Sequence, residues 1–137
     1  MKKTLNRIAL SFFALTILLF AANITRAQYD ITPKKTLKSP ATVRGFIGGE
    51  AHDSYVIRAR KGQTMTVQIT WKQEAKNHAD FTVSYSSSFF TTETGKFGKE
   101  SNNGRSWRGK IPSTGNYYIY VVAHPSAKYT LKVRLIN

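Results

Sequence analysis

Three adjacent residues, His52, Asp53 and Ser54, are of the types that carry out nucleophilic catalysis. Catalytic triads, however, bring these side chains together from separate segments, and the chain has no Gly-x-Ser-x-Gly elbow to present a serine nucleophile. The seven acidic residues give no signal of a paired-carboxylate site, because most of them fall near expected strand ends or in loops. We therefore expect a binding protein and not an enzyme, with no catalytic residues.

Metal and cofactor chemistry has no better support in the sequence. The three histidines, His52, His78 and His124, lie far apart and show no ligand spacing such as His-x-x-x-His. The chain contains no cysteine, which excludes a thiol nucleophile, thiolate metal ligands and disulfides. We expect no metal site and no cofactor, and stability must come from a packed core.

Recognition of anions by lysine and arginine is the chemistry that the sequence does favour. A first group of cations lies between residues 86 and 111, where phenylalanines accompany them, and arginine and aromatic side chains are common interface anchors. The phenylalanines, Phe89, Phe90 and Phe97, fit equally well a role in holding a long loop against the core. The partner-binding candidates in this group are Lys96, Lys99, Arg105, Arg108 and Lys110.

A second group would form if two strands with outward cations were neighbours. Alternation places Arg58 outward, with Arg60 at the following turn, and it places Lys132 and Arg134 outward near the C-terminus. Side by side, these four residues would make an alternative cationic face that attracts an anionic partner. The other interpretation, which the sequence favours, is a solvated edge that uses charge to discourage pairing with another sheet.

The elements that must position these residues are short β-strands. From residue 42 onward apolar and polar residues alternate, as in strands with one buried face, and no stretch has a convincing helical period. Glycine, proline and asparagine mark turns near residues 62, 103 and 113. The pattern predicts an all-β protein, a small antiparallel β-sandwich of about seven to eight strands. We expect strands at 42–47, 54–60, 64–71, 81–85, 106–111, 117–122 and 129–136, with a long loop between residues 86 and 101.

Tyr118 and Tyr120 share one face of the strand expected at 117–122. Exposed aromatic rings can stack on sugars, which would suit a carbohydrate-binding module. Val122 lies on the same face, however, and apolar residues on both faces favour a central strand that is buried on both sides.

The N-terminal segment predicts export. Lys2, Lys3 and Arg7 precede an apolar run at 8–22, and Thr25 and Ala27 are the small residues expected at positions −3 and −1 of a cleavage site. The run is shorter than the roughly 20 residues that span a bilayer. We expect a signal peptide at residues 1–27, no transmembrane segment after its cleavage, and a periplasmic or extracellular location. A flexible, proline- and lysine-rich lead-in at 28–40 should precede a single domain at residues 41–137.

The protein is strongly basic, with 21 lysines and arginines against 7 acidic residues. The expected signal peptide holds four of those cations and no acid, so the exported chain keeps 17 cations against 7 anions. This excess indicates a partner that is anionic at least locally. Export removes nucleic acid as the usual target, and anionic cell-envelope polysaccharide is the more plausible polyanion.

Four stretches of the sequence occur in an informative order: DSYVIRARKGQ (53–63), MTVQI (65–69), IPSTGNYYIYV (111–121) and YTLKV (129–133). They contain the motifs Asp-x-Tyr, Ala-x-Lys-Gly-Gln and Pro-x-Thr-Gly-x-Tyr. Together they resemble the bacterial prepeptidase C-terminal (PPC) domain family and, within it, the periplasmic inhibitors of goose-type (g-type) lysozyme. The resemblance covers residues 45–135, with an undefined middle at 72–105, and implies a jelly-roll or PPC-like β-sandwich that binds rather than catalyses.

The resemblance also implies a protein partner, a g-type lysozyme, whose active-site cleft would be blocked by a loop of the sandwich. Arg105 or Arg108 would then hydrogen-bond the catalytic acid. Family inhibitors tend to present polar and basic residues from loops at one end of the sandwich, whereas here the connection before the last strand, 123–127, is short. The alternative function is a non-catalytic module that binds anionic cell-envelope polysaccharide or another glycan.

Overall fold

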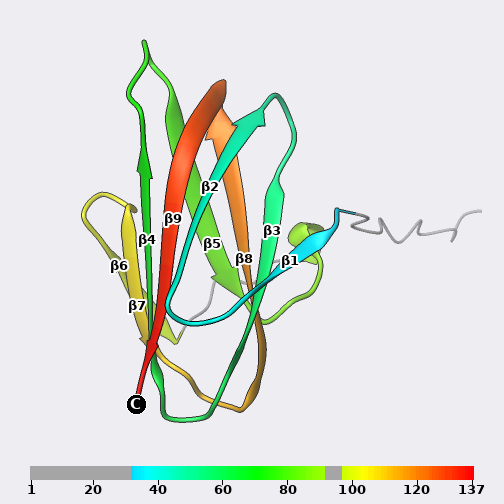
Figure 1. The fold of residues 1–137 in the computed structure, drawn as a ribbon, viewed down its shortest axis with the longest axis vertical. Helices are drawn as coiled ribbons and strands as arrows, with labels where there is room; N and C mark the ends of the chain where they lie inside the picture. Colours follow the sequence, from blue (N-terminus) through cyan, green and yellow to red (C-terminus); the bar gives the residue numbers. More distant parts are fainter. Residues whose placement is uncertain (1–31, 92–96) are drawn as a thin grey trace, which may run out of the picture.

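The computed structural model describes residues 32–91 and 97–137, which form two β-sheets packed face to face (Figure 1). The signal peptide expected at residues 1–27 lies outside the described residues. A short 3-10 helix, η2 (Phe89–Thr91), follows the fifth strand. The strands are β1 (Lys34–Leu37), β2 (Ala41–Gly48), β3 (Asp53–Ala59), β4 (Thr64–Trp71), β5 (His78–Ser84), β6 (Gly98–Ser101), β7 (Ser106–Lys110), β8 (Gly115–His124) and β9 (Ser126–Ile136).

The two sheets have the orders β1-β3-β8-β5 and β2-β9-β4-β7-β6. Neighbouring strands are antiparallel, except that β1 pairs with β3 in parallel. The antiparallel β-sandwich expected from the alternating pattern is therefore confirmed. The seven expected strands are all present, and two further strands, β1 and β6, bring the total in the described residues to nine.

The core lies between the sheets and is built from the inward positions of each strand. Tyr55 and Ile57 of β3 are buried on one side, and Met65, Val67 and Ile69 of β4 are buried on the other. Burial of apolar area at about 25 cal/mol per Å² is the main force that holds the sheets together, since the chain has no disulfide. Tyr85, the last residue of the strand expected at 81–85, instead follows the end of β5; it is 45% exposed and packs at the rim against Phe97 and Tyr117.

The lead-in at 28–40, expected to be flexible and unpacked, contains a strand. Lys34–Leu37 pairs with Ser54–Ile57 of β3, and the Leu37 side chain is buried in the core. The Lys35 ammonium donates a hydrogen bond to Asp53 at 3.1 Å, so the strand is held at both ends. One buried leucine and one ion pair carry this contact, which is too little to produce an alternating pattern in the sequence.

The stretch at 86–101, expected as one long loop, divides into parts with different roles. Gly98–Ser101 forms β6, the outermost strand of the five-stranded sheet. The segment at 86–90 lies on the outer face of the other sheet, where Phe89 contacts Tyr120 and the Tyr120 hydroxyl donates to the Ser86 carbonyl at 2.8 Å. Tyr120 is thereby buried on the outer side of β8, as expected for a central strand, while Tyr118 is half-buried. Residues 92–96 lie outside the described residues.

Candidate functional site

The outer face of the five-stranded sheet carries most of the cations that the fold brings together. On β9, alternation points Lys128, Lys132 and Arg134 away from the buried Tyr129, Leu131 and Val133. Register then sets their neighbours across the sheet. Arg134 lies opposite Thr66 of β4, Thr66 lies opposite Arg108 of β7, and Arg108 lies opposite Lys99 of β6.

The same face continues on the other strands. Lys110 of β7 lies opposite Thr64, and Arg44 of β2 lies opposite Thr130. All of these cationic side chains are exposed. We name this surface the cationic face; its residues are Arg44, Lys99, Arg108, Lys110, Lys128, Lys132 and Arg134.

The cationic face has almost no counter-charge. Among the described residues, none of its seven cations forms an ion pair. The acid beside it, Glu74, pairs with Lys72 at 2.8 Å, and this hydrogen bond raises the pKa of Lys72 and lowers the pKa of Glu74. The Glu100 side chain belongs to the opposite face of β6, because Glu100 lies opposite the inward Trp107. The field of the face is therefore strongly positive.

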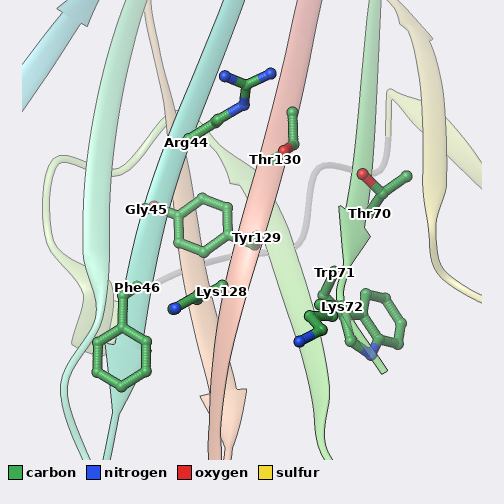
Figure 2. A pocket seen from close by; sticks show the side chains of 9 residues that line it. All are labelled: Arg44, Gly45, Phe46, Thr70, Trp71, Lys72, Lys128, Tyr129 and Thr130. Atoms are coloured by element: carbon green, nitrogen blue, oxygen red, sulfur yellow. The ribbon is translucent and has the colours of Figure 1, made fainter. Parts of the chain in front are cut away.

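A shallow groove of about 480 Å³ crosses the face where β2, β9 and β4 lie side by side (Figure 2). Arg44 and Phe46 stand on its β2 side, and Thr70 and Lys72 on its β4 side. Phe46 is 63% exposed and is the largest apolar surface of this face. A groove with an exposed aromatic ring, hydroxyl groups and cations has the chemistry to hold a polar, negatively charged ring.

The β6–β7 hairpin carries a second feature, an arginine stacked on a tryptophan. Asn102, Asn103 and Gly104 form the tight turn with positive φ angles, and the Arg105 carbonyl accepts a hydrogen bond from Ile69 of β4 at 2.9 Å. The Arg105 guanidinium lies 4.0 Å from the ring centre of Trp71. Such a contact holds an exposed arginine in one orientation without neutralising its charge.

Four of the five cations expected in the first group are thus placed on one hairpin: Lys99 on β6, Arg105 at the turn, and Arg108 and Lys110 on β7. Lys96 lies outside the described residues. Phe97 packs on Trp107 and Tyr117 and so anchors the hairpin to the core. Phe89 lies on the opposite sheet, stacked on His52, so the phenylalanines do not form one surface.

The alternative cationic face expected from Arg58, Arg60, Lys132 and Arg134 does not form. Arg58 belongs to β3 in the four-stranded sheet, opposite Asn116 of β8, and Arg60 follows the end of that strand. Lys132 and Arg134 belong to β9 in the other sheet. The strands do not adjoin, because β9 pairs with β2 and β4, and alternation alone carries no information about strand order.

Arg44 and Phe46 are functional candidates that were not predicted from the sequence. The alternating pattern could have predicted that both side chains point outward, because Ile47 is inward and residues 44 and 46 lie on the opposite face of β2. Their neighbours Lys128 and Thr130 could not be assigned without the register.

The residues considered for catalysis have structural roles. Asp53 accepts hydrogen bonds from Lys35 and from the Tyr129 hydroxyl, and Ser54 is fully buried. His52 stacks on Phe89 at 4.3 Å, and His78 lies beside His124 on the neighbouring strand. Within residues 32–91 and 97–137, no three His, Cys, Asp or Glu side chains come together as a metal site would require. The same residues contain no helix long and apolar enough to cross a membrane.

Comparison with solved structures places this fold among known proteins. PliG of Aeromonas hydrophila, a periplasmic inhibitor of g-type lysozyme, matches with a TM-score of 0.60 and 22% identity, over 76% of this chain and 96% of that one. The pre-peptidase C-terminal domain of a Bacillus anthracis collagenase matches with a TM-score of 0.57 and 17% identity, over 78% of this chain and 100% of that one. PliG of Salmonella Typhimurium matches with a TM-score of 0.50 and 20% identity, over 74% of this chain and 97% of that one.

No protein-family model and no curated protein matches the sequence. At these identities the comparisons establish the fold alone. The chain thus has the β-sandwich fold seen in PPC domains and in periplasmic g-type lysozyme inhibitors, as the sequence resemblance implies.

Proposed function

We propose that this protein is an exported inhibitor of g-type lysozyme that acts by obstructing the glycan-binding cleft of the enzyme. The observation that carries the proposal is the shared fold: the chain matches nearly the whole length of an inhibitor whose described target is g-type lysozyme. The expected signal peptide agrees with a periplasmic location, where that inhibitor acts.

The β6–β7 hairpin supplies the chemistry for such a contact. A lysozyme cleft contains catalytic carboxylates, and an arginine donates two parallel hydrogen bonds to a carboxylate. Arg105 is held on Trp71 at the turn of the hairpin, and Arg108 extends from the next strand. A side chain that is already oriented loses less conformational entropy when it binds, which favours a tight contact.

The overall charge of the protein does not assist this encounter. Lysozymes are often basic, so two positive molecules would repel each other at distances within the Debye length. The arginines would act through local, water-excluded contacts with the catalytic acids, and the affinity should depend weakly on salt.

Titration of g-type and hen-type lysozymes with the purified protein, followed by cell-wall lysis, tests the proposal. We expect near-stoichiometric loss of g-type activity and no loss of hen-type activity. If neither enzyme slows at a large molar excess, the protein is not a lysozyme inhibitor.

The double variant Arg105→Ala with Arg108→Ala tests the role of the hairpin. Because a hydrogen bond to a charged group contributes about 1.5–3 kcal/mol, we expect inhibition to weaken by about tenfold or more. The matched control is Arg58→Ala with Arg60→Ala, which removes two exposed arginines from the other sheet and should leave inhibition unchanged. If the hairpin variant inhibits g-type lysozyme as strongly as the control variant does, another loop contacts the enzyme.

A further inference from the structure

The cations of the cationic face are arranged as a regular array. Along β9, Lys132 and Arg134 are two residues apart, a distance of about 6.6–6.8 Å on one face of a strand. Across the sheet, each step to a neighbouring strand is about 4.8 Å. One row runs from Arg134 through Thr66 and Arg108 to Lys99. Every cation therefore has others within the reach of one extended polymer.

This arrangement opposes folding in the absence of a partner. Lys99 and Arg108 lie directly opposite each other, and like charges in that position are destabilising. None of the described carboxylates forms an ion pair with either side chain. A surface of this kind is relieved of repulsion when an anion binds to it.

Protection of a sheet edge does not explain the array. Charged residues that discourage strand pairing belong on edge strands, which in this sheet are β2 and β6. Lys128, Lys132 and Arg134 lie on β9, whose two sides are already paired with β2 and β4. The outer face of the four-stranded sheet differs, because Tyr120 and the segment at 86–90 cover part of it with apolar groups.

The side chains between the cations indicate what kind of anion would bind. The outward positions that are not cationic are mostly hydroxyl and amide groups, which hydrogen-bond to sugars. They are Thr42, Thr64, Thr66, Gln68, Thr70, Ser106 and Thr130. The exposed Phe46 stands beside the groove at one end, where a sugar ring can stack while Arg44 or Lys128 binds its acidic group.

Other macromolecules fit this face less well. Single-stranded nucleic acid is held by a series of exposed aromatic rings on which successive bases stack. Of the three aromatic residues that line the groove, Phe46 is exposed, Tyr129 is buried, and Trp71 is partly buried with Arg105 stacked on its ring. Protein interfaces have an apolar or aromatic centre with few charges, whereas the centre of this face is Thr66, Gln68, Lys132 and Arg134. A linear polysaccharide can bind without an apolar centre of this kind.

We propose that the cationic face binds a linear polysaccharide that carries acidic groups along its length, with the Phe46 groove as one terminal subsite. Binding is electrostatic along β9 and the β6–β7 hairpin, and hydroxyl contacts with the threonines orient the chain. The inference does not depend on lysozyme inhibition, because it rests on the register and charge of the sheet.

A fluorescently labelled decasaccharide of alginate, a polyuronate, serves as the probe, and its affinity is measured over a salt series. The test variant is Lys128→Gln with Lys132→Gln and Arg134→Gln. We expect affinity to fall by about tenfold or more and the salt dependence to become shallower, because fewer counterions are released. Thermal unfolding should show this variant to be no less stable, since it relieves repulsion.

The matched control is Arg58→Gln with Arg60→Gln and Lys61→Gln, which removes the same charge at exposed positions away from the cationic face. We expect it to bind within about twofold of the unchanged protein, given the roughly 10 Å range of screened charges. Phe46→Ala should weaken binding of the decasaccharide without changing the salt dependence, because it removes a stacking contact and no charge.

Three results would overturn the proposal. The first is absence of binding at low salt. The second is an equal loss in the two triple variants, which would mean that net charge and not the face decides. The third is tighter binding of an oligothymidylate or an anionic lipid vesicle than of the decasaccharide under the same conditions, which would assign the face to nucleic acid or membrane. If the variant Lys128→Gln with Lys132→Gln and Arg134→Gln still inhibits g-type lysozyme, polysaccharide binding and lysozyme inhibition use different residues.

Discussion

A single missing methyl group at Gly45 allows the core to close over β2. The ring of Tyr129 crosses this glycine, and a Cβ atom there would lie 2.5 Å from the tyrosine oxygen and 2.6 Å from its Cζ atom. The ring cannot easily retreat, because its hydroxyl is bonded to Asp53 and Tyr55. Gly45 is therefore fixed by packing and not by a turn.

We expect Gly45→Ala to lower the free energy of unfolding by about 1–3 kcal/mol, the usual cost of overpacking a core. Urea denaturation measures this loss. Gly48→Ala on the same strand is the control, since its Cβ would meet Ser126 at an ordinary 3.4 Å, and it should be neutral or slightly stabilising. Equal stability of the two variants would mean that Tyr129 moves aside without loss.

At the scale of elements, β1 joins the lead-in to the sandwich through one apolar side chain. Leu37 is 7% exposed and contributes to the core, while Thr36 beside it is exposed. We expect Leu37→Ala to cost about 2 kcal/mol, at the low end for a buried leucine because β1 is an edge strand. Denaturant titration gives the cost, with Thr36→Ala as the control.

Limited proteolysis shows whether β1 is the element that has loosened. Cleavage near residues 34–40 should become faster in Leu37→Ala and stay unchanged in Thr36→Ala. If proteolysis accelerates in neither variant, the strand is held mainly by its backbone bonds with β3 and by the Lys35–Asp53 pair.

The elements also show what the sequence could and could not reveal. Strands with several alternating core residues were predictable, and β4 has the expected bounds, Thr64–Trp71. The two unexpected strands, β1 and β6, are four residues long and lie at sheet edges, so they bury too little to produce a pattern. Outward cations such as Arg58 and Lys132 were predictable one by one, but whether they meet depends on strand order.

At the scale of the whole molecule, a buried cluster of hydroxyl groups ties the two sheets together. The Tyr129 hydroxyl on β9 donates a hydrogen bond to Asp53 on β3, and its oxygen lies 2.6 Å from the Tyr55 hydroxyl. Lys35 of β1 reaches the other oxygen of the same carboxylate at 3.1 Å. In a sandwich without disulfides this cluster joins β9 to β3, two strands that share no backbone bonds.

The cluster makes stability depend on alkaline pH. Burial first, and then the hydrogen bonds with Asp53 and Tyr55, raise the pKa of Tyr129 far above its ordinary value, and burial also raises the pKa of Tyr55. Unfolded tyrosine loses its proton near pH 10, so above that pH the unfolded chain binds fewer protons than the folded one. The stabilisation is therefore complete below about pH 10 and is lost as the pH rises toward the folded values.

We expect the free energy of unfolding to fall steeply above about pH 10, and Tyr129→Phe to make that fall shallower. The variant should also be less stable at neutral pH by about 1–3 kcal/mol, because Asp53 loses a hydrogen-bond donor inside the sandwich. Urea denaturation on both sides of pH 10 measures both effects, with Tyr118→Phe, outside the cluster, as the control. The same alkaline slope in Tyr129→Phe as in the unchanged protein would mean that ionisation of the Tyr129 hydroxyl is not the cause of the alkaline loss of stability.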